Sequence, residues 1–139
     1  MNKRNAARFV RGVFVGTFLL ATAVSLSGCL VPTHVLSDAD GGKIRAVDVG
    51  DDVLIRLSGN ASTGFHWERT APTAFAETAL EPIREGSYKS LGSPLGSPGL
   101  FCFRYSAVRQ GTVTLTFTYL RTWEDEPPLA TYAVVIWVR

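Results

Sequence analysis

The chain has 139 residues, of which 14 are Lys or Arg and 12 are Asp or Glu, so its formal net charge at pH 7 is +2. Four of the basic residues and none of the acidic ones fall within the first 28 positions, which leaves 10 basic and 12 acidic side chains, a net charge of −2, in the rest of the chain. That part contains no Lys/Arg cluster along the sequence, which argues against binding of nucleic acid or of anionic lipid.

The first 28 residues predict an export signal. An apolar stretch over residues 12–25 follows four basic side chains, and no acidic residue appears before Asp38. The four basic residues are Lys3, Arg4, Arg8 and Arg11. This order of charge and hydropathy is that of a signal peptide. The stretch is also shorter than the roughly 20 residues that a stable membrane-spanning helix needs, so we expect it to be removed.

The signal ends in Leu26-Ser27-Gly28-Cys29, which resembles the lipobox of bacterial lipoproteins. That resemblance implies cleavage before Cys29 and transfer of diacylglycerol to its thiol. We therefore expect an exported protein that is lipid-anchored to the bacterial cell envelope, and Leu30 in the next position is compatible with sorting to an outer membrane. The alternative is an ordinary secretory signal with an accidental cysteine.

Residues 29–42 are expected to form the lipidated N-terminus and a tether. They contain Pro32, Asp38, Asp40 and the pair Gly41-Gly42, and a flexible stretch of this length spans on the order of 20 Å. Because Cys29 would carry lipid, Cys102 is left without an intramolecular disulfide partner. The domain over residues 43–139 must then rely on its own hydrophobic core.

Short β-branched and aromatic segments between Gly, Pro, Asn and Asp predict an all-β domain of six or seven strands. The clearest segments are residues 44–47, 53–57, 65–69, 101–107, 113–119 and 131–138, with less regular ones near 78–84 and 86–89. Residues 101–107 and 113–119 both alternate and flank Gln110-Gly111, so we expect them to form a hairpin. This spacing predicts an immunoglobulin-like antiparallel β-sandwich of about seven strands. Trp67 and Trp137 are assigned to its packing.

Three loops carry the remaining information, because antiparallel strands reverse at every turn and should bring these loops to one end of the sandwich. Loop 1 is Asn60, Ala61, Ser62, Thr63, Gly64 and Phe65; loop 2 is Gly96, Ser97, Pro98 and Gly99; loop 3 is Arg121, Thr122 and Trp123. Loop 1 is small and polar, and loop 3 contains the two residue types most enriched at binding hot spots. Together they predict a narrow wedge with an aromatic anchor, suited to filling a cleft.

These loops resemble those of the chagasin-type inhibitors of papain-like cysteine peptidases. The family's first loop is Asn-Pro-Thr-Thr-Gly-Tyr before a Trp, its second is a Gly-rich turn before alternating aromatics, and its third is Arg-Pro-Trp. Here residues 60–65 precede Trp67, residues 96–99 precede Phe103 and Tyr105, and residues 121–123 follow a strand. The resemblance covers residues 43–139.

The resemblance implies reversible, competitive inhibition without chemistry by the inhibitor, and we expect it to act as a monomer. Loop 1 would lie over the catalytic cysteine of the peptidase, with the closest contacts from Thr63 and Gly64. Trp123 would supply an aromatic stack and Arg121 polar contacts. Ala61 and Thr122 stand where the family has Pro, a residue whose rigid backbone stabilises a loop conformation by about 0.4 to 1 kcal/mol. Pro98 stands where Gly is frequent.

Other interpretations concern the same residues. Loop 1 taken alone is also compatible with an ordinary turn, and Trp123 with a cap on the core. Cys102 with His34 or His66 does not make a convincing thiol nucleophile, since no third group orients the pair. Two histidines do not make a zinc site. We therefore expect no enzyme activity, metal or cofactor. The alternative function is a lipid-anchored immunoglobulin-like binding or structural module without inhibitory activity.

Overall fold

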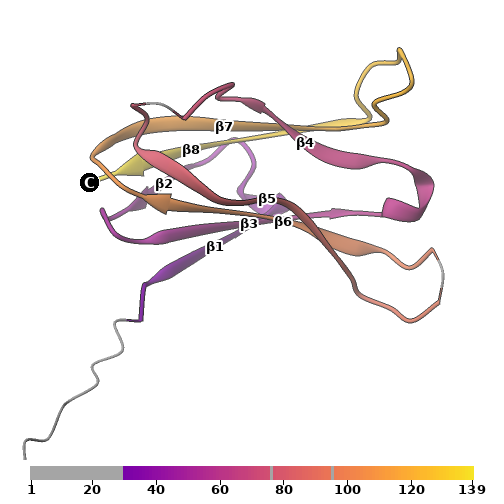
Figure 1. Ribbon diagram of the computed structural model, residues 1–139, viewed down its shortest axis with the longest axis horizontal. Helices are drawn as coiled ribbons and strands as arrows, with labels where there is room; N and C mark the ends of the chain where they lie inside the picture. Colours follow the sequence, from indigo (N-terminus) through magenta and orange to yellow (C-terminus); the bar gives the residue numbers. More distant parts are fainter. Residues whose placement is uncertain (1–29, 76, 95) are drawn as a thin grey trace, which may run out of the picture.

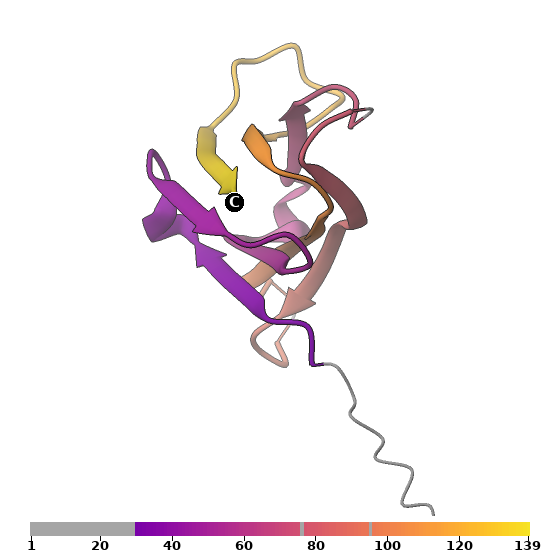
Figure 2. The same ribbon diagram turned by 90° about the vertical axis from the view of Figure 1, so that its left-hand side faces the viewer.

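The architecture of the chain is two β-sheets packed face to face (Figure 1; Figure 2). The computed structural model describes residues 30–75, 77–94 and 96–139. The expected signal peptide and Cys29 lie outside the described residues. Within them, no helix is both long and apolar enough to cross a membrane.

The two sheets contain four strands each. Sheet A has the order β1 (Thr33–Ser37), β3 (Asp52–Gly59), β6 (Gly99–Ala107) and β5 (Leu80–Ser90). Sheet B has the order β2 (Ile44–Val47), β8 (Ala130–Val138), β7 (Gly111–Leu120) and β4 (His66–Ala71). Two short 3-10 turns, η1 (Asp38–Asp40) and η2 (Ala61–Thr63), follow β1 and β3. The all-β sandwich prediction is confirmed.

The edge strands β1 and β2 differ from the prediction of a purely antiparallel sandwich, because each pairs in parallel with its neighbour. The β1 strand also lies within the segment expected to be a flexible tether. That expectation is wrong for residues 33–40, which form β1 and η1, and the folded domain begins at Thr33 rather than at residue 43. A five-residue strand with one buried apolar side chain, Leu36, is too short to show a clear alternating pattern.

The hairpin predicted from residues 101–119 is also wrong. The β6 strand belongs to sheet A and β7 to sheet B, so the chain crosses between the sheets after Ala107. Both strands alternate because each buries one face in the same core, where the rings of Phe103 and Phe117 lie 4.5 Å apart. Alternation identifies the buried face of a strand but not its hydrogen-bonding partner.

The core is formed by the inward-facing side chains of both sheets. Trp67 is buried, as predicted. Trp137 is not, with 50% of its surface exposed, because its neighbours Ile136 and Val138 point inward and side chains alternate along a strand. The largest fully buried side chains are Tyr105, Phe103, Phe117, Ile55, Leu57, Leu80, Leu115 and Ile136.

Strand direction determines which parts of the chain lie at each end of the sandwich. The connections β3–β4, β5–β6 and β7–β8 lie together at the right-hand end of Figure 1. The pairings of Thr33 with Asp52 and of Val138 with Gly111 put the start of β1 and the end of β8 at the opposite end. We call these the loop end and the anchor end.

Candidate functional site

Loop 1 is a single, well-capped turn of 3-10 helix. The Asn60 side-chain oxygen accepts hydrogen bonds from the backbone N–H (3.1 Å) and the hydroxyl (2.7 Å) of Ser62. The Thr63 hydroxyl donates to the Asn60 carbonyl oxygen at 2.6 Å. Gly64 ends the turn in the left-handed region, with φ 81°, and its N–H donates to the Ala61 carbonyl oxygen at 3.1 Å. These local bonds fix the loop in one conformation although its middle residues, Ala61, Ser62 and Thr63, are exposed.

Asn60 also joins loop 1 to loop 2. Its side-chain Nδ2 donates to the carbonyl oxygen of Gly96 at 2.8 Å. Its backbone N–H donates to the Tyr119 hydroxyl at 2.9 Å. One residue therefore caps loop 1, links it to a loop 36 positions later and anchors it to β7.

Arg121 joins loop 1 to loop 3. Its Nε donates to the carbonyl oxygen of Thr63 at 3.0 Å, and its guanidinium lies over the Phe65 ring with 4.3 Å to the centroid. A further ion pair to Glu124, at 2.7 Å, holds the turn of loop 3. The resemblance gave Arg121 a contact with the peptidase, and the structure adds an intramolecular role for the same side chain.

Trp123 lies at the surface of the loop end with 67% of its area exposed, so the interpretation as a core cap is wrong. Its ring packs directly on the backbone of Gly64. A Cβ at Gly64 would lie 2.6 Å from the Trp123 Cη2 atom, far inside van der Waals contact. Gly64 is therefore required both by its positive φ and by the tryptophan above it.

Loop 2 is held from beneath by Tyr88. The Tyr88 hydroxyl donates to the Ser97 carbonyl oxygen at 3.1 Å, and the Ser97 hydroxyl donates to the Pro94 carbonyl oxygen at 2.7 Å. Gly99, the first residue of β6, lies so close to the Tyr88 ring that a side chain there would overlap it. Pro98 contributes its carbonyl oxygen to the N–H of Leu91 at 3.0 Å. The loop is thus tied to β5.

Tyr119 is a site residue that sequence reasoning missed. Its ring stacks on Phe65 at 5.3 Å and packs against Trp67 at 5.2 Å, while its hydroxyl receives the Asn60 N–H. Trp67 in turn donates from Nε1 to the Ser58 carbonyl oxygen at 2.9 Å. The signals in the sequence were its place at the end of the alternating segment 113–119 and its position two residues before Arg121. An aromatic layer therefore supports the exposed loops.

The remaining candidates do not come together. Cys102 lies on the outer face of sheet A, whereas His66 starts β4 in sheet B. In the described part of the chain no group of three or more His, Cys, Asp or Glu residues could hold a metal ion. His34 contacts the Asp51 carboxylate at 2.7 Å, and the Cys102 thiol lies against the Leu100 carbonyl oxygen. Within the described residues, neither of the thiol–imidazole pairs considered from the sequence is therefore formed.

The chain is similar in sequence to known peptidase inhibitors. Residues 46–136 match the family described as Chagasin family peptidase inhibitor I42. Amoebiasin-2 of Entamoeba histolytica is 28% identical over 106 residues, which cover 74% of this chain and 85% of the relative. Chagasin of Trypanosoma cruzi is 30% identical over 92 residues, covering 66% and 84% respectively.

A solved structure shows the same fold. The crystal structure of the cysteine protease inhibitor EhICP2 from Entamoeba histolytica superimposes with a TM-score of 0.68 at 23% identity, and the match covers 79% of this chain and 98% of that one. The family match extends from β2 to β8 and includes all three loops. The chain therefore belongs to the chagasin family of peptidase inhibitors and is an inhibitor, not an enzyme.

Proposed function

We propose that this protein is a reversible, competitive inhibitor of papain-like cysteine peptidases, and that it inserts loops 1, 2 and 3 into the active-site cleft. The observation that carries the proposal is the pair of cross-links made by Asn60 and Arg121, which join the three loops into one surface. Membership in a peptidase inhibitor family supports it. The fold shared with a cysteine protease inhibitor is consistent with the class of target.

The inhibitor needs no reactive group in this mechanism. Ala61, Ser62 and Thr63 are small and exposed, so their backbone can approach a narrow cleft closely. The polar groups of loop 1 are already hydrogen-bonded within the molecule, so little conformational entropy is lost on binding. Trp123 is the expected hot spot, because it offers a large, rigid apolar surface beside the wedge.

The proposal includes export and a lipid on Cys29. The described chain leaves the fold at the start of β1, which is the anchor end. Seven residue steps separate Asp52 from Gly59 along β3, and at about 3.4 Å per residue this is roughly 24 Å. A lipid at Cys29 would thus attach the domain by the end remote from its inhibitory loops.

The direct test is titration of papain with the fragment Leu30–Arg139, which contains all eight strands of the sandwich. We expect stoichiometric, reversible loss of activity that excess substrate overcomes. A fragment with a cooperative unfolding transition that leaves papain fully active at micromolar concentration would contradict the proposal. That result would favour a lipid-anchored structural module.

A matched pair of tryptophan variants tests the loop assignment. Trp123→Ala should weaken inhibition about 30-fold or more, the effect of losing a hot spot worth roughly 2 kcal/mol, without lowering the unfolding temperature. Trp137→Ala removes a half-exposed tryptophan from sheet B, away from the loop end, and should inhibit like the parent. Equal inhibition constants for the two variants would show that loop 3 does not contact the peptidase.

A further inference from the structure

We propose that the outer face of sheet A docks on an anionic phospholipid bilayer, so that the anchored domain lies along the membrane surface. The inference rests on the lipid anchor at Cys29 included in the proposed function. It concerns a face of the molecule that the three loops do not use.

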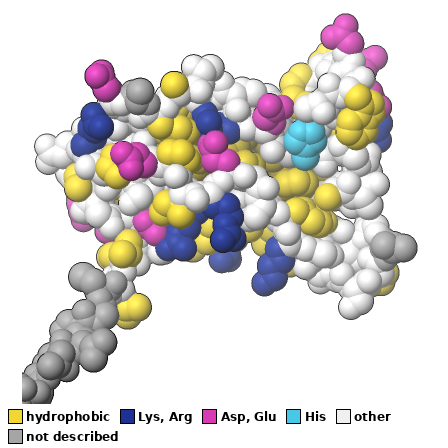
Figure 3. All heavy atoms as spheres, viewed as in Figure 1, with side chains coloured by type: hydrophobic (Ala, Val, Ile, Leu, Met, Phe, Trp, Pro, Cys, Tyr) yellow, Lys and Arg dark blue, Asp and Glu magenta, His cyan; other side chains and the backbone are white. Residues whose placement is uncertain are grey.

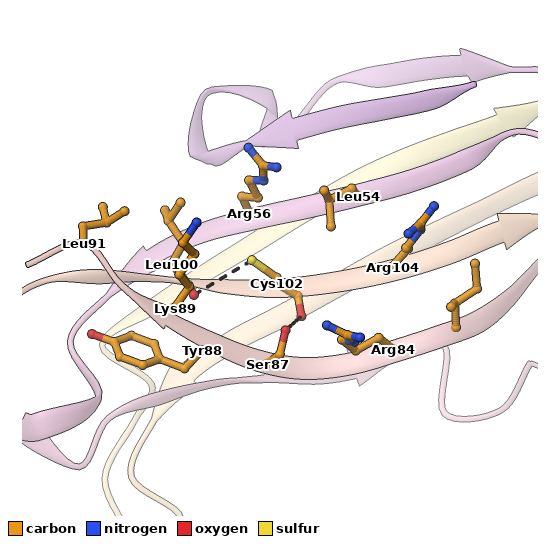
Figure 4. A pocket seen from close by; sticks show the side chains of 11 residues that line it. Leu54, Arg56, Arg84, Ser87, Tyr88, Lys89, Leu91, Leu100, Cys102 and Arg104 are labelled. Carbon is orange, nitrogen blue, oxygen red and sulfur yellow. Dashed lines mark hydrogen bonds between the residues drawn. The ribbon is translucent and has the colours of Figure 1, made fainter. Parts of the chain in front are cut away.

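Four basic side chains that are far apart in the sequence meet on this face. Arg56 comes from β3, Arg104 from β6, and Arg84 and Lys89 from β5. They line a cavity of about 600 Å³, in which Arg56 and Arg104 project from neighbouring strands (Figure 4). In the space-filling view, dark blue side chains gather along the lower edge of the molecule, over sheet A (Figure 3). We call this surface the basic groove.

Most of the charge of the basic groove is not neutralised. Arg104 pairs with Asp52, whose carboxylate it contacts at 2.9 Å through Nε. Among residues 30–75, 77–94 and 96–139, no acidic side chain lies within ion-pairing distance of Arg56, Arg84 or Lys89. The part of the chain after residue 28 has a net charge of −2. The lining of the basic groove thus carries three unpaired cations on a negative domain, which favours an anionic partner. The same outer face also carries the carboxylates of Asp38, which accepts from the Ser58 hydroxyl at 2.7 Å, and of Glu81, in the row that contains Thr33.

Apolar side chains stand among these cations. Ile83 and Leu91, both more than half exposed, line the basic groove together with Leu54 and Leu100. Val35 of β1 is also exposed on the same face and is paired with Leu54. Basic and apolar side chains on one surface are the combination that binds the headgroup region of anionic bilayers.

The position of the anchor favours a membrane over any other anionic partner. Four residue steps separate Cys29 from Thr33, a reach of at most about 14 Å. Thr33 begins β1, the edge strand of sheet A. Two residues further along β1, Val35 points to the outer face of sheet A. It is paired across the sheet with Leu54, then Arg104, then Arg84. A lipid on Cys29 would hold this row next to the bilayer, at a high effective concentration.

Docking would change how the inhibitor presents its loops. With sheet A flat on the bilayer, the strands run parallel to the membrane plane, and the loop end points sideways rather than outward. The three loops would then meet a peptidase that works close to the same surface. The anchor alone would leave this orientation undetermined.

The native thiol of Cys102 provides the test, because it lines the basic groove and is partly exposed. The full chain is produced in a bacterium that processes lipoproteins, and the mature protein is reconstituted into phosphatidylcholine vesicles with or without one-third phosphatidylglycerol. The measurement is the rate at which a neutral, membrane-impermeant maleimide alkylates Cys102. We expect alkylation to be at least about fivefold slower on the anionic vesicles and to recover in 0.5 M salt. A thiol at the loop end, Glu126→Cys in a Cys102→Ser background, should react at the same rate on both.

Charge reversals identify the face responsible. Each basic side chain near an anionic surface favours docking about fivefold, so Arg56→Glu with Lys89→Glu should abolish the protection of Cys102. Lys43→Glu with Arg109→Glu changes the net charge equally outside the basic groove and should leave the protection intact. Equal alkylation on both vesicle types, or full protection in the Arg56→Glu/Lys89→Glu variant, would overturn the proposal.

Two further measurements separate this inference from the proposed function. Papain inhibition in detergent reports the loops alone and should be the same for both double variants. If only Arg56→Glu with Lys89→Glu weakened inhibition, the groove would be a peptidase contact and the membrane proposal would be wrong. Mass spectrometry of the N-terminal peptide reports the lipid on Cys29. An unmodified cysteine would overturn the lipid anchor and the membrane docking that depends on it, whether or not the protein inhibits papain.

Discussion

The two ends of the sandwich are held together by different interactions. At the loop end, amide, hydroxyl and backbone groups of Asn60, Thr63 and Tyr119 form most of the hydrogen bonds. The Arg121 guanidinium donates one more, to the Thr63 carbonyl oxygen. At the anchor end, carboxylates predominate: His34 contacts Asp51 at 2.7 Å, and Arg139 contacts Asp48 at 3.1 Å. The conformation of the loops is therefore set mainly by amide, hydroxyl and backbone groups, whereas the β1 strand is joined to the turn before β3 through the Asp51 carboxylate.

The largest effect on papain inhibition should come from Gly64→Ala, which introduces a steric clash at the loop end. The new Cβ would lie 2.6 Å from Trp123, so the tryptophan or the turn must move, and we expect inhibition of papain to weaken more than 100-fold. Gly42→Ala is the matched control, because Gly42 has a similar φ of 76° but no atom within 4 Å of a Cβ. Both variants should lose roughly 1 to 2 kcal/mol of stability from the positive φ.

Urea unfolding and papain titration of the two glycine variants distinguish a general loss of stability from a displacement of loop 1 or Trp123. If Gly42→Ala impaired inhibition as much as Gly64→Ala, the loss would follow from general destabilisation. The contact between loop 1 and Trp123 would then have no special part in binding.

Asn60→Ala should have the next largest effect, since it removes both the cap of loop 1 and the link to loop 2. Loss of a cap and of one further hydrogen bond amounts to roughly 2 kcal/mol, or about 30-fold in the inhibition constant. Thr78→Ala is the control. It removes a hydroxyl that lies 2.8 Å from the carbonyl oxygen of Leu80, the first residue of β5, and 3.1 Å from that of Phe75, at the anchor end. It should reduce stability but leave papain inhibition unchanged.

The sequence was sufficient to predict the sandwich and the three loops, because alternation along residues 101–107 and 113–119 reports burial directly. It was not sufficient to predict pairing between strands, so β6 and β7 were joined wrongly. Nor could it predict the ties between loops. Asn60 meets Gly96 and Tyr119 across 36 and 59 positions, and an asparagine in a turn has local reasons to be there.

The sequence alone also did not predict the clustering of charge in the basic groove. Arg56, Arg84, Lys89 and Arg104 are dispersed over nearly 50 positions, so no cluster appears along the chain. They meet because β3, β6 and β5 are neighbours in sheet A. The short β1 strand was missed for a related reason: Leu36 is its one buried residue, and its pairing with β3 is tertiary information.

Acid should weaken the anchor end before the loop end. The backbone N–H of Asp48, followed by the His34 ring, lowers the pKa of the Asp51 carboxyl. Because the folded pKa lies below the unfolded value of about 3.9, Asp51 stabilises the fold above that pH. The contribution is lost as pH falls through the folded value. Asp51→Asn should therefore be less stable than the parent at pH 7, and the difference should disappear in strong acid.

Urea unfolding from pH 7 down to pH 2 measures this difference, with Glu126→Gln as a control that removes an exposed charge at the loop end. The Asp51→Asn variant should inhibit papain like the parent at pH 6. A stability difference that grew on acidification would show that the carboxylate does not stabilise the anchor end.

The smallest effect should come from Ala61→Pro, which restores the residue that the family has in loop 1. Ala61 is the first residue of η2, a position where proline is favoured because its N–H has no partner within the turn. Asn60 before it is extended, with φ −133° and ψ 102°, as a residue preceding proline must be. The substitution should tighten papain inhibition by about 2- to 5-fold, and Ala61→Gly should weaken it. If Ala61→Pro raised stability without tightening inhibition, the ties made by Asn60 and Arg121 would already hold the loop rigid, and the family's proline would serve the fold rather than the complex.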